Sequence, residues 1–224
     1  MPYYEAAFHI NRLYAQRHGY AFAYHGPGDY TATGADRNVA WRKVQHLKDQ
    51  LECCCQWALW MDSDSFLVMQ AHALSVEGWI SLASGDSRRM TTLLGNMHSF
   101  PGLRDGADPV AAVSTNEPHE LGAQPFCTSN MLFTRTKRSL EVLDFWYNAT
   151  GGVPDLAEFL HEFPWEQAPF NYLVSRKFFE AIEPFPIGQV QGWGSDFIRN
   201  VNHYMVEERK FVPSEHLKEV LSRG

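Results

Sequence analysis

The feature that most constrains the fold is the segment Trp57–Gln70, "WALWMDSDSFLVMQ". Two apolar runs, residues 57–61 and 66–69, lie on either side of Asp62-Ser63-Asp64. Short continuous apolar runs of this length are typical of strands buried inside a sheet. We therefore expect a strand, a short polar loop and a second strand, with both carboxylates placed where the first strand leaves the sheet.

Helical and strand patterns alternate around this segment. Residues 3–18 have apolar side chains at a helical period, and Gly19 follows where a helix cap belongs. Further helices are expected over residues 40–55, 73–84, 138–149, 155–163 and 166–182, and strands over 20–24, 57–61, 109–115 and 130–135, with short strands and turns from 183 to 211. The alternation predicts an α/β fold with a mostly parallel sheet flanked by helices.

The composition fits one globular domain over residues 1–224, because 45% of the residues are hydrophobic and no internal repeat or linker is present. A formal net charge of -7, with no run of five Lys or Arg, argues against a nucleic-acid partner. Neither a signal peptide nor an apolar run of membrane-spanning length is present. Cys53, Cys54 and Cys55 match neither a disulfide framework nor zinc-ligand spacing, so we expect buried or half-buried thiols.

Asp62 and Asp64 have two interpretations. Ligands of open α/β sheets bind beyond the carboxyl ends of strands, and two carboxylates there can bind one hard cation together with substrate phosphates. Alternatively, Asp and Ser are common in turns, where their side chains accept hydrogen bonds from nearby backbone amides. The flanking apolar runs favour a strand, a loop and a strand, but they leave both interpretations open.

The order of motifs resembles that of glycosyltransferase family 34, the galactosyl-, xylosyl- and mannosyltransferases with a GT-A fold. Such enzymes have an Asn, Tyr-Ala and His-Gly-Tyr stretch, then Trp-x-Lys, then an apolar strand that ends in Asp-x-Asp. The matching residues are Asn11, Tyr14, Ala15, His18, Gly19, Tyr20, Trp41, Lys43, Asp62 and Asp64. Further along the chain the match to the family is only partial, because Thr128 and Asn130 replace the family's Asn and Gly.

The resemblance implies a GT-A-like fold and a retaining transfer of a hexose or pentose from a nucleotide-diphosphate sugar to a glycan acceptor. It implies that Lys43, Asp62, Ser63 and Asp64 bind the donor and that the two aspartates hold Mn²⁺. Glu166 and Gln167, in "WEQAPFNYLV", would lie beside the acceptor and the anomeric carbon. Alternatively, Glu166 is an acidic residue at a helix start, which the helix dipole favours.

Residues near the C-terminus would complete the site. The family has a histidine ligand there, and we expect His203 to fill this role, although the family pattern Asp-Phe-x-x-His aligns Asn200 with the ligand. Arg209 and Lys210 are candidates for contacts with the diphosphate, or they form a solvated charge cluster.

The family also has a strand before the helix that contains Asn11, and this strand is absent from the sequence as given. We therefore consider a fragment of a longer anchored enzyme, in the Golgi lumen, and otherwise a cytoplasmic protein. A non-catalytic binding protein with the same fold is the main alternative function. A metal-dependent phosphohydrolase that uses the same aspartates is a third, and no second carboxylate cluster supports it.

Overall fold

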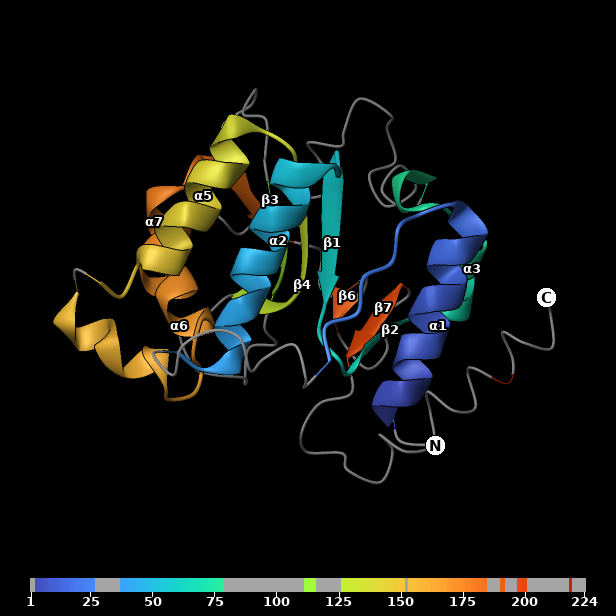
Figure 1. Ribbon diagram of the computed structural model, residues 1–224, viewed down its shortest axis with the longest axis horizontal. Helices are drawn as coiled ribbons and strands as arrows, with labels where there is room; N and C mark the ends of the chain where they lie inside the picture. Colours follow the sequence, from blue (N-terminus) through green and yellow to red (C-terminus); the bar gives the residue numbers. More distant parts are fainter. Residues whose placement is uncertain are drawn as a thin grey trace. The chain divides into compact units, whose positions relative to one another are not determined.

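The computed structural model describes residues 3–26, 37–78, 111–115, 126–151, 153–184, 190–191, 197–200 and 218. The chain packs into two compact units (Figure 1). Unit 1 consists of residues Met1–Tyr24, Met61–Leu93 and Pro186–Gly224, and unit 2 of His25–Trp60 and Leu94–Phe185. The expected single domain over residues 1–224 stays a prediction.

Unit 2 is built on a four-stranded sheet with the order β1-β4-β3-β5. These strands are β1 (Trp57–Met61), β3 (Ala111–Thr115), β4 (Phe126–Thr134) and β5 (Ile182–Pro184). Strand β3 pairs antiparallel with β4 and parallel with β5. Most side chains of β4 are buried, as expected for a strand covered on both faces.

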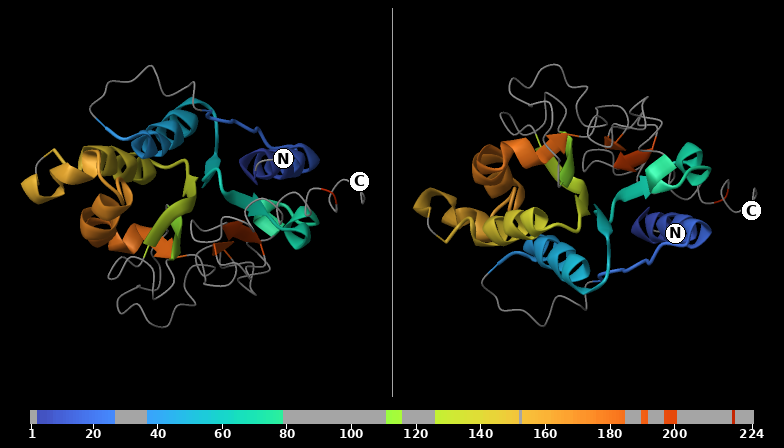
Figure 2. Two further views of the ribbon diagram at one scale, coloured as in Figure 1. Left: turned by 90° about the horizontal axis from the view of Figure 1, so that it is seen from below. Right: turned by 90° about the horizontal axis from the view of Figure 1, so that it is seen from above.

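Two amphipathic helices of unit 2 lie side by side (Figures 1 and 2). Helix α2 (Arg42–Cys53) continues a 3₁₀ turn, η2 (Val39–Trp41), and α5 (Lys137–Asn148) begins after Thr136, whose Oγ1 accepts from the backbone N of Ser139 at 3.0 Å. This side-chain cap satisfies one of the donors that a helix N-terminus leaves open. Each helix turns its apolar stripe inward. The buried residues of the two stripes are Val44, Leu47, Leu51, Val142, Leu143 and Trp146.

A second helical segment closes the core of unit 2. It comprises η3 (Pro154–Leu160), α6 (Gln167–Pro169), the π-helical η4 (Phe170–Val174), α7 (Ser175–Lys177) and η5 (Phe179–Ala181). Phe170 packs edge-on against both Trp146 and Phe126, with ring centroids 4.8 and 5.8 Å apart. Edge-to-face packing at such distances is favourable for aromatic pairs. Through Phe170, the segment packs against both α5 and the start of β4.

The described part of unit 1 includes a three-stranded sheet and the helices α1 and α3. Its elements are α1 (Tyr3–His18), β2 (Ser65–Leu67), α3 (Met69–His72), β6 (Val190–Gln191) and β7 (Ile198–Asn200). The sheet order is β2-β7-β6, with β2 antiparallel and β6 parallel to β7. Helix α1 packs on β2. It ends at Gly19, whose φ of +71° is the left-handed conformation that glycine adopts without a steric penalty.

Most expected elements are present, including the strand over residues 57–61 and the helix that ends at Gly19. Residues 20–24 are wrongly predicted as a strand: they are irregular and four of the five are exposed. The helix expected over 73–84 is only partly described, with α3 before it and one turn at 76–78. Cys53 and Cys54 are exposed, which corrects the expected burial, while Cys55 is half-buried and Cys127 buried.

Both sheets are mixed, whereas the sequence favours a mostly parallel one. The reason is visible between β3 and β4, which only ten residues, 116–125, separate. A parallel crossover takes about a dozen residues or more, usually a helix, so a shorter connection favours an antiparallel return. Among the described helices, none has the length and apolar character needed to cross a bilayer.

Candidate functional site

Asp62-Ser63-Asp64 forms the turn between β1 and β2. The backbone N of Ser65 donates to the carbonyl O of Asp62 at 2.9 Å, which closes the turn around Ser63 and Asp64. Ser63 is exposed, and both aspartates are half-buried. Because backbone atoms close the turn, this bond does not itself occupy the carboxylates. The expected strand, loop and strand are confirmed, while both interpretations of the aspartate side chains stay predictions.

Asn11, the first residue of the motif near the N-terminus, binds the free edge of β2. Its Nδ2 donates to the carbonyl O of Ser65 at 2.9 Å, and its Oδ1 accepts from the backbone N of Leu67 at 3.1 Å. The side-chain amide thus bonds β2 as a neighbouring strand would. This contact fixes the strand that begins directly after the acidic turn.

Three further motif residues bind the chain beyond β2. Tyr14 donates from its hydroxyl to the carbonyl O of Leu74 at 2.9 Å, and the Nε2 of His18 lies 3.2 Å from the carbonyl O of His72. Tyr20 donates to Glu77 and accepts from the backbone N of Val76. Burial raises the pKa of the Tyr14 hydroxyl, and burial followed by the bond to Glu77 raises the pKa of Tyr20. The motif residues therefore anchor the segment that follows the acidic turn.

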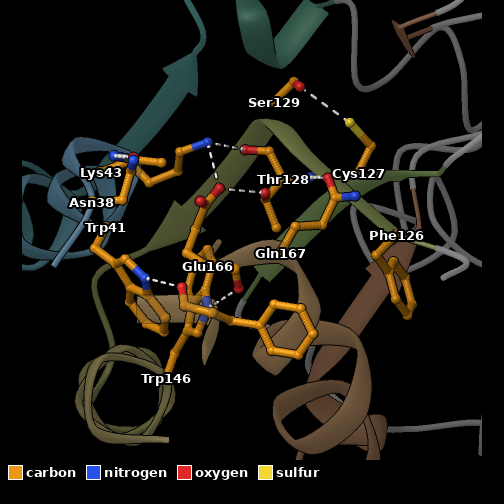
Figure 3. A network of polar contacts seen from close by, with 12 residues as sticks. Asn38, Trp41, Lys43, Phe126, Cys127, Thr128, Ser129, Trp146, Glu166 and Gln167 are labelled. Atoms are coloured by element: carbon orange, nitrogen blue, oxygen red, sulfur yellow. Dashed lines mark hydrogen bonds and ion pairs between the residues drawn. The ribbon is translucent and has the colours of Figure 1, made fainter. Parts of the chain in front are cut away.

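A buried polar network lies in the core of unit 2 (Figure 3). Nζ of Lys43 is 2.8 Å from Oε1 of Glu166 and donates to the carbonyl O of Thr128 at 3.2 Å. The Thr128 hydroxyl donates to the same Glu166 oxygen at 2.8 Å. Lys43 is 5% exposed and Glu166 3% exposed. A buried carboxylate needs this kind of paired and hydrogen-bonded environment to stay charged.

Gln167 and Asn171 hold the first residues of β4. Oε1 of Gln167 accepts from the backbone N of Thr128 at 3.1 Å. The side chain of Asn171 binds both backbone groups of Phe126, with its Oδ1 and Nδ2 each at 2.9 Å. Since the carbonyl oxygen of the Gln167 amide faces the backbone, the amide nitrogen is the donor left for another contact.

The backbone that leads into Glu166 is strained. Trp165 has a φ of +45°, a conformation that a bulky side chain rarely adopts and that costs about 1–3 kcal/mol. Nε1 of the buried Trp146 donates to the carbonyl O of Glu166 at 2.8 Å. The tertiary contacts of Glu166, through both its carbonyl and its carboxylate, offset the strain and fix where Gln167 begins the next helix.

The structure brings together three of the residues singled out in the sequence, Lys43, Glu166 and Gln167 (Figure 3). Lys43 contacts Glu166 and the carbonyl O of Thr128, both within the protein, so its binding of a diphosphate stays a prediction. Asp62, Ser63 and Asp64 belong to unit 1. His203, Arg209 and Lys210 lie outside the described residues. No cluster of three His, Cys, Asp or Glu able to hold a metal exists among the residues that the structure describes.

Sequence reasoning missed the structural roles of Thr128, Asn171 and Trp146. Thr128 stood out only as a departure from the family pattern. Asn171 lies in the otherwise apolar run "APFNYLV", and a polar residue among buried ones is a signal that could have indicated an internal hydrogen-bonding role. Nothing in the sequence spacing connects Trp146 to Glu166.

These features define a mixed α/β protein with an acidic turn directly after a strand and a buried polar network beside another. It is similar to the crystal structure of a glycosyltransferase involved in the glycosylation of the major capsid of PBCV-1, with a TM-score of 0.62 and 16% sequence identity. The likeness covers 97% of this chain and 92% of that chain. No protein-family model matches the chain, and no curated protein matches it. The likeness supports a fold shared with a glycosyltransferase, while the GT-A parallel sheet and membership of family 34 stay predictions.

Proposed function

We propose that the protein transfers a sugar from a nucleotide-diphosphate donor to a glycan acceptor. The observation that carries the proposal is the Asp62–Ser65 turn, which places two carboxylates directly after a strand of a chain with a glycosyltransferase fold. In α/β sheets, ligands collect beyond the ends of strands, where loops are free to vary.

A divalent cation fits this proposal. Asp62 and Asp64 would hold Mn²⁺ or a similar hard cation, since such ions prefer carboxylate and carbonyl oxygens. When bound, the ion would offset the negative charge that grows on the departing diphosphate. The chain's own part is to hold these carboxylates in place, through the turn bond of Ser65 and the contact of Asn11 with β2.

Gln167 and Glu166 would position the donor and the acceptor. The Gln167 amide is oriented by its bond to Thr128, so its nitrogen can donate to a sugar hydroxyl without first reorganising. Lys43 compensates the charge of Glu166, which suits the carboxylate to a positioning role more than to attack on a sugar. We therefore favour a retaining transfer in which the departing diphosphate accepts the acceptor's proton.

The test is release of nucleoside diphosphate from UDP-galactose, UDP-xylose and GDP-mannose in the presence of Mn²⁺, with and without oligosaccharide acceptors. Asp62→Ala and Asp64→Ala are expected to abolish release. Asp155→Ala, which removes an exposed carboxylate of η3, is the matched control and is expected to leave release unchanged.

Three results would contradict the proposal. Full activity in both aspartate variants would remove the acidic turn from the mechanism. Donor binding without turnover, measured by calorimetry for every donor and acceptor, would favour a non-catalytic binding protein instead. Release of phosphate from simple esters without a sugar donor would indicate a phosphohydrolase.

A further inference from the structure

Three consecutive thiols lie where α2 ends and the chain turns towards β1 (Figure 1). Cys53 and Cys54 are exposed, and Cys55 is half-buried. Sγ of Cys54 lies 4.0 Å from Sγ of Cys55, and the Cys54 thiol also forms a hydrogen bond with the thiol of Cys53. The sulfur of Cys54 therefore contacts both of its neighbours.

The backbone of the turn brings the sulfurs of Cys54 and Cys55 together. Neighbouring side chains diverge in a helix and point to opposite faces in a strand. Cys54 has neither conformation, with a φ of -155° and a ψ of -25°. The backbone N of Cys54 and that of Cys55 both donate to the carbonyl O of Gln50, at 3.2 and 3.0 Å, and the Cys55 thiol donates to Oε1 of Gln50 at 3.8 Å. These bonds hold the two thiols in a defined turn.

A metal ion suits this pair of thiols better than a disulfide does. The Cα atoms of adjacent residues are about 3.8 Å apart, which is below the roughly 4.4–6.8 Å usual for a disulfide, so a bond between the two sulfurs would be strained. One ion can reach both sulfurs without that strain, because two metal–sulfur bonds of about 2.3 Å span more than the distance between them. The end of α2 also has the partial negative charge of a helix C-terminus, which favours a cation over bare thiolates.

The number of ligands selects the ion. Thiolates favour soft ions such as Cu(I) and Zn²⁺. Structural Zn²⁺ almost always has four protein ligands, and among the residues that the structure describes no set of even three His, Cys, Asp or Glu could hold a metal. Two thiolates are enough for the soft, monovalent Cu(I), and the complex then has a single net negative charge. The guanidinium of Arg135 can offset this charge, since its Nη2 donates to the carbonyl O of Glu52, next to the thiols, at 3.3 Å.

We propose that Cys54 and Cys55 bind Cu(I) through their two thiolates, with Cys53 outside the coordination. The two thiols release their protons to solvent as the two copper–sulfur bonds form, and no electron is transferred. A hydrogen bond with Cys54 raises the pKa of the Cys53 thiol, which therefore keeps its proton most readily. The proposal does not depend on the proposed sugar transfer, because it uses neither the acidic turn nor the network around Glu166.

The test is titration of the whole, reduced chain with Cu(I) in the absence of oxygen, in competition with the Cu(I) chelator bicinchoninate. Cys54→Ser and Cys55→Ser each leave one thiolate, so each is expected to raise the Cu(I) dissociation constant by at least about 100-fold, the low end of the gain from linking two contacts. Cys53→Ser changes the neighbouring exposed thiol and is the matched control, which should leave the dissociation constant unchanged. Binding should become tighter as the pH rises, with two protons released per ion.

Three results would overturn the proposal. Equal weakening by Cys53→Ser would show that the ion is not held by Cys54 and Cys55 alone. The same dissociation constant in Cys54→Ser/Cys55→Ser and in the wild type would place the copper elsewhere in the chain. Displacement of Cu(I) by excess Mn²⁺ would indicate oxygen ligands, because a hard ion does not compete for thiolates. Circular dichroism of each variant shows whether it is folded, so that loss of binding is not confused with loss of structure.

Discussion

Nζ of Lys43 lies 2.8 Å from Oε1 of Glu166, and the two side chains are almost completely removed from solvent. Removing two charges from water costs more than their attraction usually returns, unless further hydrogen bonds complete the site. Thr128 provides such bonds through its hydroxyl and its carbonyl. The pair therefore fixes the position of Glu166 relative to α2 and β4 more than it adds net stability.

Breaking this pair is expected to be costly. Lys43→Met leaves the Glu166 carboxylate buried without its cation, and we expect a loss of about 3–5 kcal/mol in the free energy of unfolding, measured with urea. Lys48→Met removes the partly exposed partner of Asp144 and should cost about 1 kcal/mol or less. The double variant Lys43→Met/Glu166→Gln should recover most of the loss. Equal costs for the Lys43 and Lys48 variants would contradict the assigned burial.

Asn11 is expected to stabilise the strand after the acidic turn. Asn11→Ala removes both side-chain bonds to β2, so we expect a loss of about 1–3 kcal/mol in the free energy of unfolding. Asn11→Asp keeps an acceptor for the N of Leu67 but cannot donate to Ser65, so its effect on the unfolding free energy should differ from that of alanine. Gln16→Ala, on the exposed side of α1, is the control. Hydrogen exchange of the Leu67 amide reports the contact directly, and unchanged exchange in Asn11→Ala would refute it.

The two anchored tyrosines predict a loss of stability at high pH. Their folded-state pKa values lie above the ordinary value of 10.0, so above about pH 10 the unfolded chain loses these protons while the folded chain retains them. Their contribution to stability is complete below that pH and falls as the pH rises towards the folded-state pKa values.

Urea unfolding at pH 8 and pH 11 measures this effect. Tyr14→Phe and Tyr20→Phe should each reduce the loss between the two pH values, because phenylalanine cannot ionise. Tyr24→Phe, at an exposed position, should leave the loss as it is in the wild type. The same loss in all four proteins would show that other groups cause it.

The cysteines should react in a defined order with an alkylating reagent. Cys54 and Cys53 are exposed, Cys55 is half-buried, and Cys127 is buried in β4. A hydrogen bond with Cys54 raises the pKa of the Cys53 thiol, which lowers its thiolate fraction near neutral pH. We expect Cys53 to react faster in Cys54→Ala than in the wild type, as peptide mass spectrometry would show. Cys127 should react only under unfolding conditions, and its rapid labelling in the native protein would contradict the structure.

If the proposed function holds, substitution of Gln167 should lower activity, whereas substitution of Asn171 should lower stability. Gln167→Glu keeps an acceptor for the N of Thr128 but loses the amide donor, so we expect sugar transfer to fall on the order of 10²-fold, as for loss of one oriented donor. Asn171→Ala removes both bonds to Phe126 and should lower the melting temperature while the folded fraction stays active. Circular dichroism measures the folded fraction of each variant. Full transfer by Gln167→Glu would exclude a role for the amide nitrogen.

Short-range sequence patterns account for the elements around the acidic turn. The apolar run of residues 57–61 predicted β1, and the helical period together with Gly19 predicted where α1 ends. Such features depend only on residues that are close in the sequence. They are the spacing of apolar side chains, the backbone freedom of glycine and the preference of Asp and Ser for solvent. The irregular stretch after Gly19 shows the limit of this reasoning, because a strand needs a partner strand that local sequence does not specify.

Which distant groups meet depends on how the whole chain packs. Lys43, Thr128 and Glu166 lie on three separate elements, and no spacing in the sequence predicts that one carboxylate oxygen binds both other side chains. The register of β2 with β7, which sets Ser65 opposite Asn200, is of the same kind. Burial is the physical reason, because a polar group removed from water must find its partners among whatever the packed core brings near it.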